Sequence, residues 1–131
     1  MLVLGRKELE RLLTPAAVIR AVESAFARYA RGEATVPSRL ALTAEEGGLL
    51  LLMPSALAGT ALGAKLVSVY PKNRERELPT IFATYVLMEP GTGRPLALLE
   101  GGFLTGIRTG ATSALAARYL ARPDSRVIAC F

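Results

Sequence analysis

The 131-residue sequence has no histidine and no tryptophan, and its one cysteine is Cys130. Without histidine it lacks the commonest general base and metal ligand, so serine–histidine or cysteine–histidine catalysis within the chain is excluded and no metal site is expected. A lone cysteine cannot form an internal disulfide, which fits a cytoplasmic location. Pro54, Gly59 and Gly63 interrupt the longest apolar run, so we expect no membrane span, and the N-terminus shows no signal-peptide pattern.

Glutamine is also missing, and Asn73 is the only asparagine. This scarcity of thermolabile side chains is typical of a thermophile, although a GC-rich genome gives the same bias. The formal net charge is +5, and 13 of the 16 basic residues are arginine. These residues are scattered and aromatic residues make up only 6%, which argues against a nucleic-acid partner. A small acidic ligand explains the surplus equally well, because guanidinium groups bind carboxylates and phosphates in bidentate fashion.

The order of apolar patterns predicts an α+β domain. A short strand and a short helix are followed by a clear amphipathic helix, which Thr14 caps and which ends near Gly32. Apolar runs separated by turn residues then predict five strands between Val36 and Leu99, followed by a last helix from about Thr105 to Ala121. Residues 125–131 are predicted to form a final strand.

Two basic residues occur within or beside predicted strands. Lys65 has Gly63 and Val67 as its neighbours on the same strand face. Spacing alone favours an edge-strand lysine that prevents aggregation. Arg39 begins another predicted strand, and taken alone it is interpreted as a solvated surface residue.

Arg108 is more informative, because the predicted helix boundary places it in the first turn of the last helix. A cation there opposes the helix dipole by about 0.3–1 kcal/mol. The free backbone N–H groups of a helix N-terminus bind anions, so an anionic ligand would make this arginine favourable, with Thr105 and Thr109 as further donors. The alternative, an arginine that turns away from the helix end, has equal weight on local evidence.

Three segments carry a family resemblance: "VPSRLAL", "GAKLVSVYPKN" and, most specifically, "LTGIRTGATSALAARYLA". Over essentially its whole length the chain resembles the N-terminal portion of the ornithine cyclodeaminase and mu-crystallin family. The resemblance implies an enzyme that uses NAD or NADP and acts on amino acids or cyclic imines, as a cyclodeaminase, an alanine dehydrogenase or a ketimine reductase. It also implies N-terminal helices packed on a mixed, largely antiparallel sheet, which joins the sheet of a second copy in a homodimer.

Matching the motifs residue by residue implies roles in ligand binding. Lys65 matches the family lysine that binds the substrate carboxylate, and Arg39 resembles the upstream arginine of the same site. Arg108 matches the arginine that reaches both substrate and cofactor. Thr80 and Thr109 resemble contacts to the dinucleotide. The resemblance therefore predicts a substrate site for a small amino, keto or imino acid, with no metal.

The same resemblance divides the chain into two parts. Residues 1–121 correspond to an incomplete substrate-binding and dimerisation domain, and residues 122–131 to a linker and the first strand of a Rossmann domain. The glycine-rich turn and the catalytic aspartate of the family would lie beyond Phe131. Because hydride transfer requires the cofactor to be held against the substrate, we expect no catalytic residue within the chain, no tight cofactor binding and no activity from the chain alone.

Three explanations of such a chain remain open. The first and most favoured is an N-terminal piece of a family enzyme: an expressed fragment, a proteolytic product, or a reading frame ended early. The second is a stand-alone module that binds a small carboxylate or pairs with a longer family member. The third and least favoured is a basic nucleic-acid binder.

Overall fold

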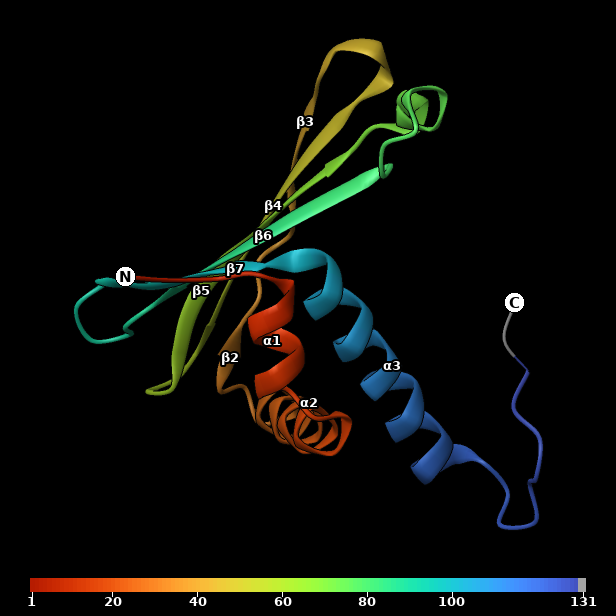
Figure 1. Cartoon of the computed structure of the whole chain (residues 1–131). Coiled ribbons are helices and arrows are strands. Elements are labelled where there is room, and N and C mark those ends of the chain that lie inside the picture. Colours follow the sequence, from red (N-terminus) through yellow and green to blue (C-terminus); the bar gives the residue numbers. More distant parts are fainter. Residues whose placement is uncertain (130–131) are drawn as a thin grey trace.

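The computed structural model describes residues 1–129, and its centre is a mixed sheet with the α-helices on one side (Figure 1). The strand order is β1-β7-β6-β5-β4-β2, and β3 also pairs with β4. Only the pairing of β1 with β7 is parallel, so the predicted mixed, largely antiparallel sheet is confirmed. The strands are β1 (Leu2–Leu4), β2 (Ala34–Thr35), β3 (Leu40–Thr43), β4 (Leu49–Leu57), β5 (Ala61–Val69), β6 (Ile81–Met88) and β7 (Pro95–Glu100).

The N-terminal helices begin and end where the sequence signals predict. They are α1 (Arg6–Leu12) and α2 (Pro15–Ala30). The Thr14 side chain accepts a hydrogen bond from the Ala17 N–H at 3.3 Å, so the predicted N-cap is confirmed. Gly32 has a φ of 75°, the left-handed conformation that ends many helices. The charged segment expected as a loop before β6 contains a short 3-10 helix, η2 (Pro71–Arg76), and a second one, η1 (Glu45–Gly47), precedes β4.

The last helix, α3 (Gly101–Leu120), begins four residues earlier than predicted. The side chain of Glu100 accepts hydrogen bonds from the backbone N–H groups of Gly102 and Phe103, and thereby supplies the N-cap. A Cβ atom added at Gly101 would come within 2.5 Å of the Ala83 backbone. Gly101 therefore lets the helix start in close contact with β6, and Gly102 leaves room for the capping side chain of Glu100.

A break in the sheet edge lies beside β4. β2 pairs with residues 56–57 of β4 and β3 pairs with residues 49–52, so residues 53–55 have no partner on that side. Pro37, between β2 and β3, and Pro54, in β4, lack the backbone N–H that a continuous ladder requires. The backbone is thus open at this edge at the middle of β4.

The final strand predicted for residues 125–131 is not formed in residues 125–129. A strand is stabilised by hydrogen bonds to a neighbour, and the described residues offer this segment none. The rest of that predicted strand, including Cys130, lies outside the described residues. Its assignment to a Rossmann domain remains a prediction.

The core lies where the sheet meets the helices. Its most buried apolar residues come from α1, α2, β5, β7 and α3: Leu9, Val18, Val67, Ala97, Ala111 and Leu115. The ends of β3 to β6 that carry η1 and η2 extend past the helices, so both sheet faces are uncovered there (Figure 1). Among residues 1–129 no helix combines the length and apolar character needed to cross a bilayer.

Candidate functional site

Lys65 lies in β5, a central strand hydrogen-bonded to β4 on one side and to β6 on the other. The interpretation as an edge-strand lysine is therefore wrong, because alternation alone does not reveal a strand's position in the sheet. Only 9% of Lys65 is exposed, although its neighbours on the same face are Gly63 and Val67. No side-chain nitrogen or oxygen of the described residues is both buried and unpartnered, so the Lys65 ammonium group is accessible from the cavities that it lines.

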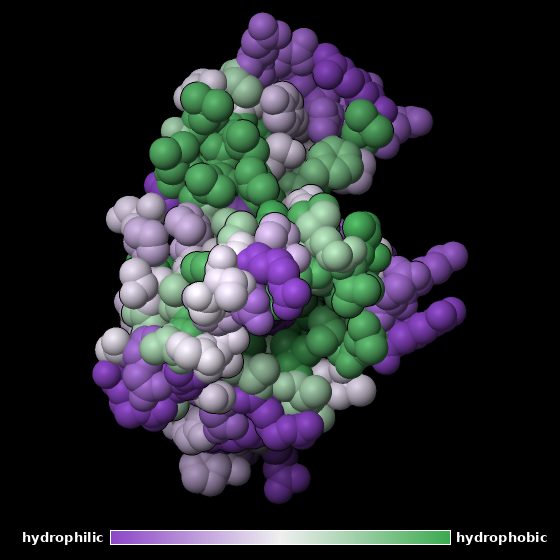
Figure 2. All heavy atoms as spheres, turned by 90° about the vertical axis from the view of Figure 1, so that its left-hand side faces the viewer, coloured by the Kyte–Doolittle hydropathy of each residue, from purple (hydrophilic) through white to green (hydrophobic). Residues whose placement is uncertain are grey.

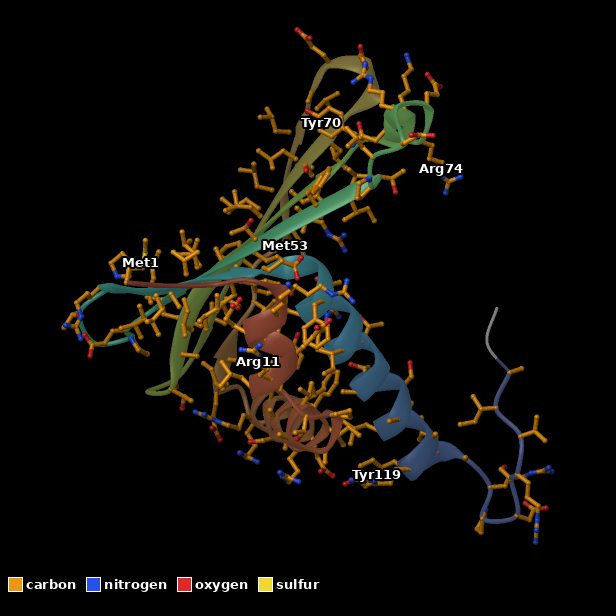
Figure 3. The ribbon with its side chains drawn as sticks, viewed as in Figure 1. Met1, Arg11, Met53, Tyr70, Arg74 and Tyr119 are labelled. Carbon is orange, nitrogen blue, oxygen red and sulfur yellow. The ribbon has the colours of Figure 1, made fainter. Side chains whose placement is uncertain are left out.

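The strand register places two side chains beside Lys65. Met53 is its partner on β4 and Tyr85 its partner on β6, and directly paired residues share a sheet face. The Lys65 Nζ lies 5.7 Å from the centre of the Tyr85 ring, a cation–π geometry. The Tyr85 hydroxyl lies 3.5 Å from the Thr105 hydroxyl on α3. Figure 3 shows Met53 midway along the sheet, far from the end that carries Tyr70.

Arg108 lies in the third turn of α3, not in its first turn. The predicted anion site at the N-terminus of this helix is also wrong, because the protein's own carboxylate, that of Glu100, occupies those N–H groups. Arg108 nevertheless faces the sheet cavity that Lys65 lines. Arg108 thus faces this cavity because of the helix face on which it lies. The helix dipole has little effect on its charge at this distance from the helix N-terminus.

Arg39 lies immediately before β3, in the break between β2 and β3. This break opens into a cleft of about 540 Å³, which we call the cationic cleft. Arg39, Lys65 and Arg108 all line it, so the structure brings together the three residues predicted to bind substrate. The other lining residues are Val36, Pro37, Ser38, Met53, Pro54, Ser55 and Tyr85.

A second cavity of about 540 Å³ shares Met53, Ser55, Lys65, Tyr85 and Arg108 with the cleft and extends between the sheet and α2. We call it the apolar cavity, because most of its wall is hydrocarbon; Figure 2 shows a hollow with mainly apolar atoms around it. Val36 is also shared with the cleft, and the further lining residues of the apolar cavity are Val22, Ala25, Phe26, Tyr29, Ala34, Ala56, Leu57, Ala61, Leu62, Gly63, Ala64, Val86, Leu87, Leu99 and Thr112.

All the charged residues that line the two cavities are positively charged. Among the described residues that line them there is no aspartate or glutamate, and none of Arg39, Lys65 and Arg108 has an acidic partner within 4.0 Å. Three cations around one cavity repel one another unless an anion lies between them. The arrangement is suited to a small carboxylate, which lysine and arginine bind by charge-assisted hydrogen bonds.

The two threonines predicted to contact a dinucleotide do not join this cluster. The Thr80 carbonyl accepts the Tyr70 N–H, which places Thr80 at the far end of the sheet, labelled by Tyr70 in Figure 3. The Thr109 hydroxyl donates to the Thr105 carbonyl at 2.7 Å, within α3. The contacts of these threonines and Arg108 to a dinucleotide therefore remain a prediction.

Sequence reasoning named only Arg39, Lys65 and Arg108 among the lining residues, and those that it missed include Met53, Ser55, Tyr85 and Thr112. Met53, Ser55 and Tyr85 depend on cross-strand register, which alternation within single strands does not fix. Thr112 follows Arg108 by four residues and so lies on the same helix face, a spacing that the sequence does contain.

Comparison with known proteins gives consistent results. The chain is 42% identical over 126 residues to an alanine dehydrogenase of Archaeoglobus fulgidus, covering 96% of the chain and 38% of the relative. It is 38% identical over 130 residues to a Delta(1)-pyrroline-2-carboxylate reductase of Bacillus cereus, covering 98% and 40%. Among solved structures, that of Thermococcus litoralis Delta(1)-pyrroline-2-carboxylate reductase with NADH and L-proline is 47% identical, with a TM-score of 0.90 and coverage of 96% and 40%.

The chain therefore spans about 40% of the length of the curated relatives it matches. Its likeness to them lies well above the level at which only a fold is shared. The model of the ornithine cyclodeaminase/mu-crystallin family matches residues 1–131, and the chain belongs to this family.

Proposed function

We propose that this chain is the substrate-binding half of an NAD(P)-dependent enzyme that acts on an amino acid or a cyclic imino acid. The observation that carries the proposal is the convergence of Arg39, Lys65 and Arg108 on one cleft without an acidic residue. The printed names of the relatives, alanine dehydrogenase and Delta(1)-pyrroline-2-carboxylate reductase, support the same class of substrate.

In this proposal each of the three cations has a different role in binding a carboxylate. Lys65 lies in a central strand beside the Tyr85 ring, so its ammonium group is held in a fixed position at the base of the site. Arg108, on α3, approaches from the helix side and can bind both carboxylate oxygens. Arg39 lies exposed at the break in the sheet edge, where it attracts the anion into the cleft.

The nicotinamide cofactor, when bound, would supply or accept the hydride. Because Thr80 and Thr109 do not converge with Arg108, we propose that the dinucleotide is held mainly by residues outside 1–129. The chain's own residues then bind and orient the substrate without performing the redox step. Accordingly, we expect the purified 131-residue chain to show no NAD(P)H turnover with pyruvate and ammonia, and measurable turnover would contradict this division.

Calorimetry with a matched pair of ligands tests the carboxylate site. Pyruvate and pyruvamide have nearly the same size, but only pyruvate carries a charge. We expect pyruvate to bind at least tenfold more tightly, because a hydrogen bond to a charged group contributes about 1.5–3 kcal/mol. Equal affinities, or binding of neither ligand, would refute a carboxylate site in this cleft.

We also propose that the sheet face opposite Lys65 pairs with a second copy of the chain. A compact monomer of 13.9 kDa exposes about 6,700 Å², whereas this chain exposes 9540 Å². Register places Leu40 and Leu42 on that face, 60% and 57% exposed, and Figure 2 shows apolar atoms gathered below the charged tip of the sheet. One structural neighbour is an archaeal alanine dehydrogenase dimer.

Light scattering after size-exclusion chromatography tests this pairing. The chain is expected to elute as a dimer, and Leu42→Lys to shift it toward monomer because the substitution buries a charge at the interface. Leu12→Lys is the matched control, since Leu12 is 63% exposed on α1, away from that face. A monomer for the unmodified chain, or equal effects of the two variants, would contradict the proposed interface.

A further inference from the structure

The apolar cavity lies next to the proposed carboxylate site. It continues directly from the cationic cleft, so a carboxylate held by Lys65 and Arg108 directs the rest of its molecule toward this hydrocarbon wall. Phe26 of α2, Leu57 of β4 and Leu87 of β6 contribute to that wall. A ligand side chain entering the cavity is thus transferred from water into apolar surroundings.

The acidic residues on the surrounding elements are already engaged elsewhere. Glu33, after α2, binds Arg28 and Arg31. Glu23 of α2 accepts a hydrogen bond from the Tyr119 hydroxyl and forms an ion pair with Arg118, and Glu100 caps α3. Among the described residues that line the cavity there is no carboxylate, so a second ammonium group on a ligand would meet only cations and hydrocarbon.

We propose that the site accepts amino, oxo or cyclic imino acids with an uncharged, apolar side chain, and rejects diamino acids. This inference rests on the proposed function, because it assumes that the cationic cleft holds the carboxylate. A terminal ammonium group would lose its hydration without gaining a counter-ion, and it would be repelled by Lys65 and Arg108. Each methylene group that enters the cavity, in contrast, strengthens binding by about fourfold.

L-Norvaline and L-ornithine form the matched pair that tests the proposal, since ornithine is norvaline with an ammonium group at the end of the side chain. We expect calorimetry to show norvaline binding at least tenfold more tightly than ornithine, and more tightly than L-alanine. Ornithine binding as tightly as norvaline, while pyruvate still binds in preference to pyruvamide, would overturn this inference alone. Failure of pyruvate and both amino acids to bind would overturn the proposed function as well.

Met53→Glu supplies the missing counter-ion. Met53 lines both cavities and pairs with Lys65 across the strands. The variant should reduce the preference for norvaline over ornithine at least tenfold, whereas Leu12→Glu, which adds the same charge on exposed α1, should leave the ratio unchanged. An unchanged ratio in a folded Met53→Glu protein, checked by circular dichroism, would contradict the proposal. The norvaline–ornithine comparison on the unmodified chain decides the matter if the variant does not fold.

Discussion

Replacing Lys65 by methionine should weaken ligand binding and strengthen the fold at the same time. Methionine keeps the length of the side chain but removes the charge, and Lys65 is 9% exposed with no acidic partner within 4.0 Å among the described residues. In the unliganded chain its ammonium group lies over the Tyr85 ring but meets no carboxylate, so its charge is only partly compensated. With a carboxylate bound, the same group forms a charge-assisted hydrogen bond.

The size of both effects follows from these surroundings. At about 4 Å and an effective dielectric constant of about 20, two unit charges attract by roughly 4 kcal/mol before desolvation is counted. A net contribution of about 1.5–3 kcal/mol to binding corresponds to roughly 10- to 150-fold in the dissociation constant. Loss of a charge that is only partly compensated should raise the free energy of unfolding by about 1 kcal/mol and the melting temperature by roughly 2–8 °C.

Calorimetry with pyruvate and thermal unfolding, measured on the same protein preparation, provide the two readings. Lys7→Met is the matched control, because Lys7 is exposed on α1 and lines neither cavity. This control should change neither reading appreciably. A Lys65→Met protein that melts at a lower temperature and binds pyruvate normally would show that Lys65 serves the fold, and the reasoning would fail.

Three further substitutions test the packing and the charges. Gly101→Ala should destabilise the fold by about 1–3 kcal/mol in urea unfolding, because its Cβ would lie 2.5 Å from the Ala83 backbone. Gly106→Ala, in open space within the same helix, should stabilise by about 0.5–1 kcal/mol, and a loss of stability there would refute this account of α3. Glu33→Gln should flatten the acid dependence of the melting temperature. Hydrogen bonds from Arg31 and Arg28 hold the pKa of Glu33 below its ordinary value. The ionised carboxylate therefore stabilises the fold above the ordinary pKa, and this stabilisation is lost as the pH falls through the lowered pKa. An unchanged acid dependence would show that these bonds do not form in solution.

Local signals in the sequence were sufficient to predict most helices and strands, but not to predict how these elements pack together. Thr14, Pro15 and Gly32 fixed the ends of α2 because capping depends on residues next to each other in the chain. The start of α3 was misplaced because glycine has a low helix propensity, while a tertiary contact with Ala83 selects glycine at Gly101.

The family resemblance named Arg39, Lys65 and Arg108, and the structure shows why spacing alone gave Lys65 a different interpretation. Whether a strand lies at an edge or in the centre depends on which other strands pair with it, and those partners come from distant parts of the chain. The Tyr85 and Met53 neighbours of Lys65 follow from the same pairings. A site built across strands is thus visible only when the register is known.

The distribution of charge links the fold to the site. Seven arginines of the described chain are paired with carboxylates, as Arg28 and Arg31 are with Glu33, whereas others such as Arg11 and Arg20 have no carboxylate of the described residues within 4.0 Å. The cationic cleft differs because three cations line one cavity there without a carboxylate among the described lining residues. Locally unfavourable arrangements of this kind are retained where function requires them. In the proposed function a small carboxylate ligand would supply the negative charge that the described lining residues lack.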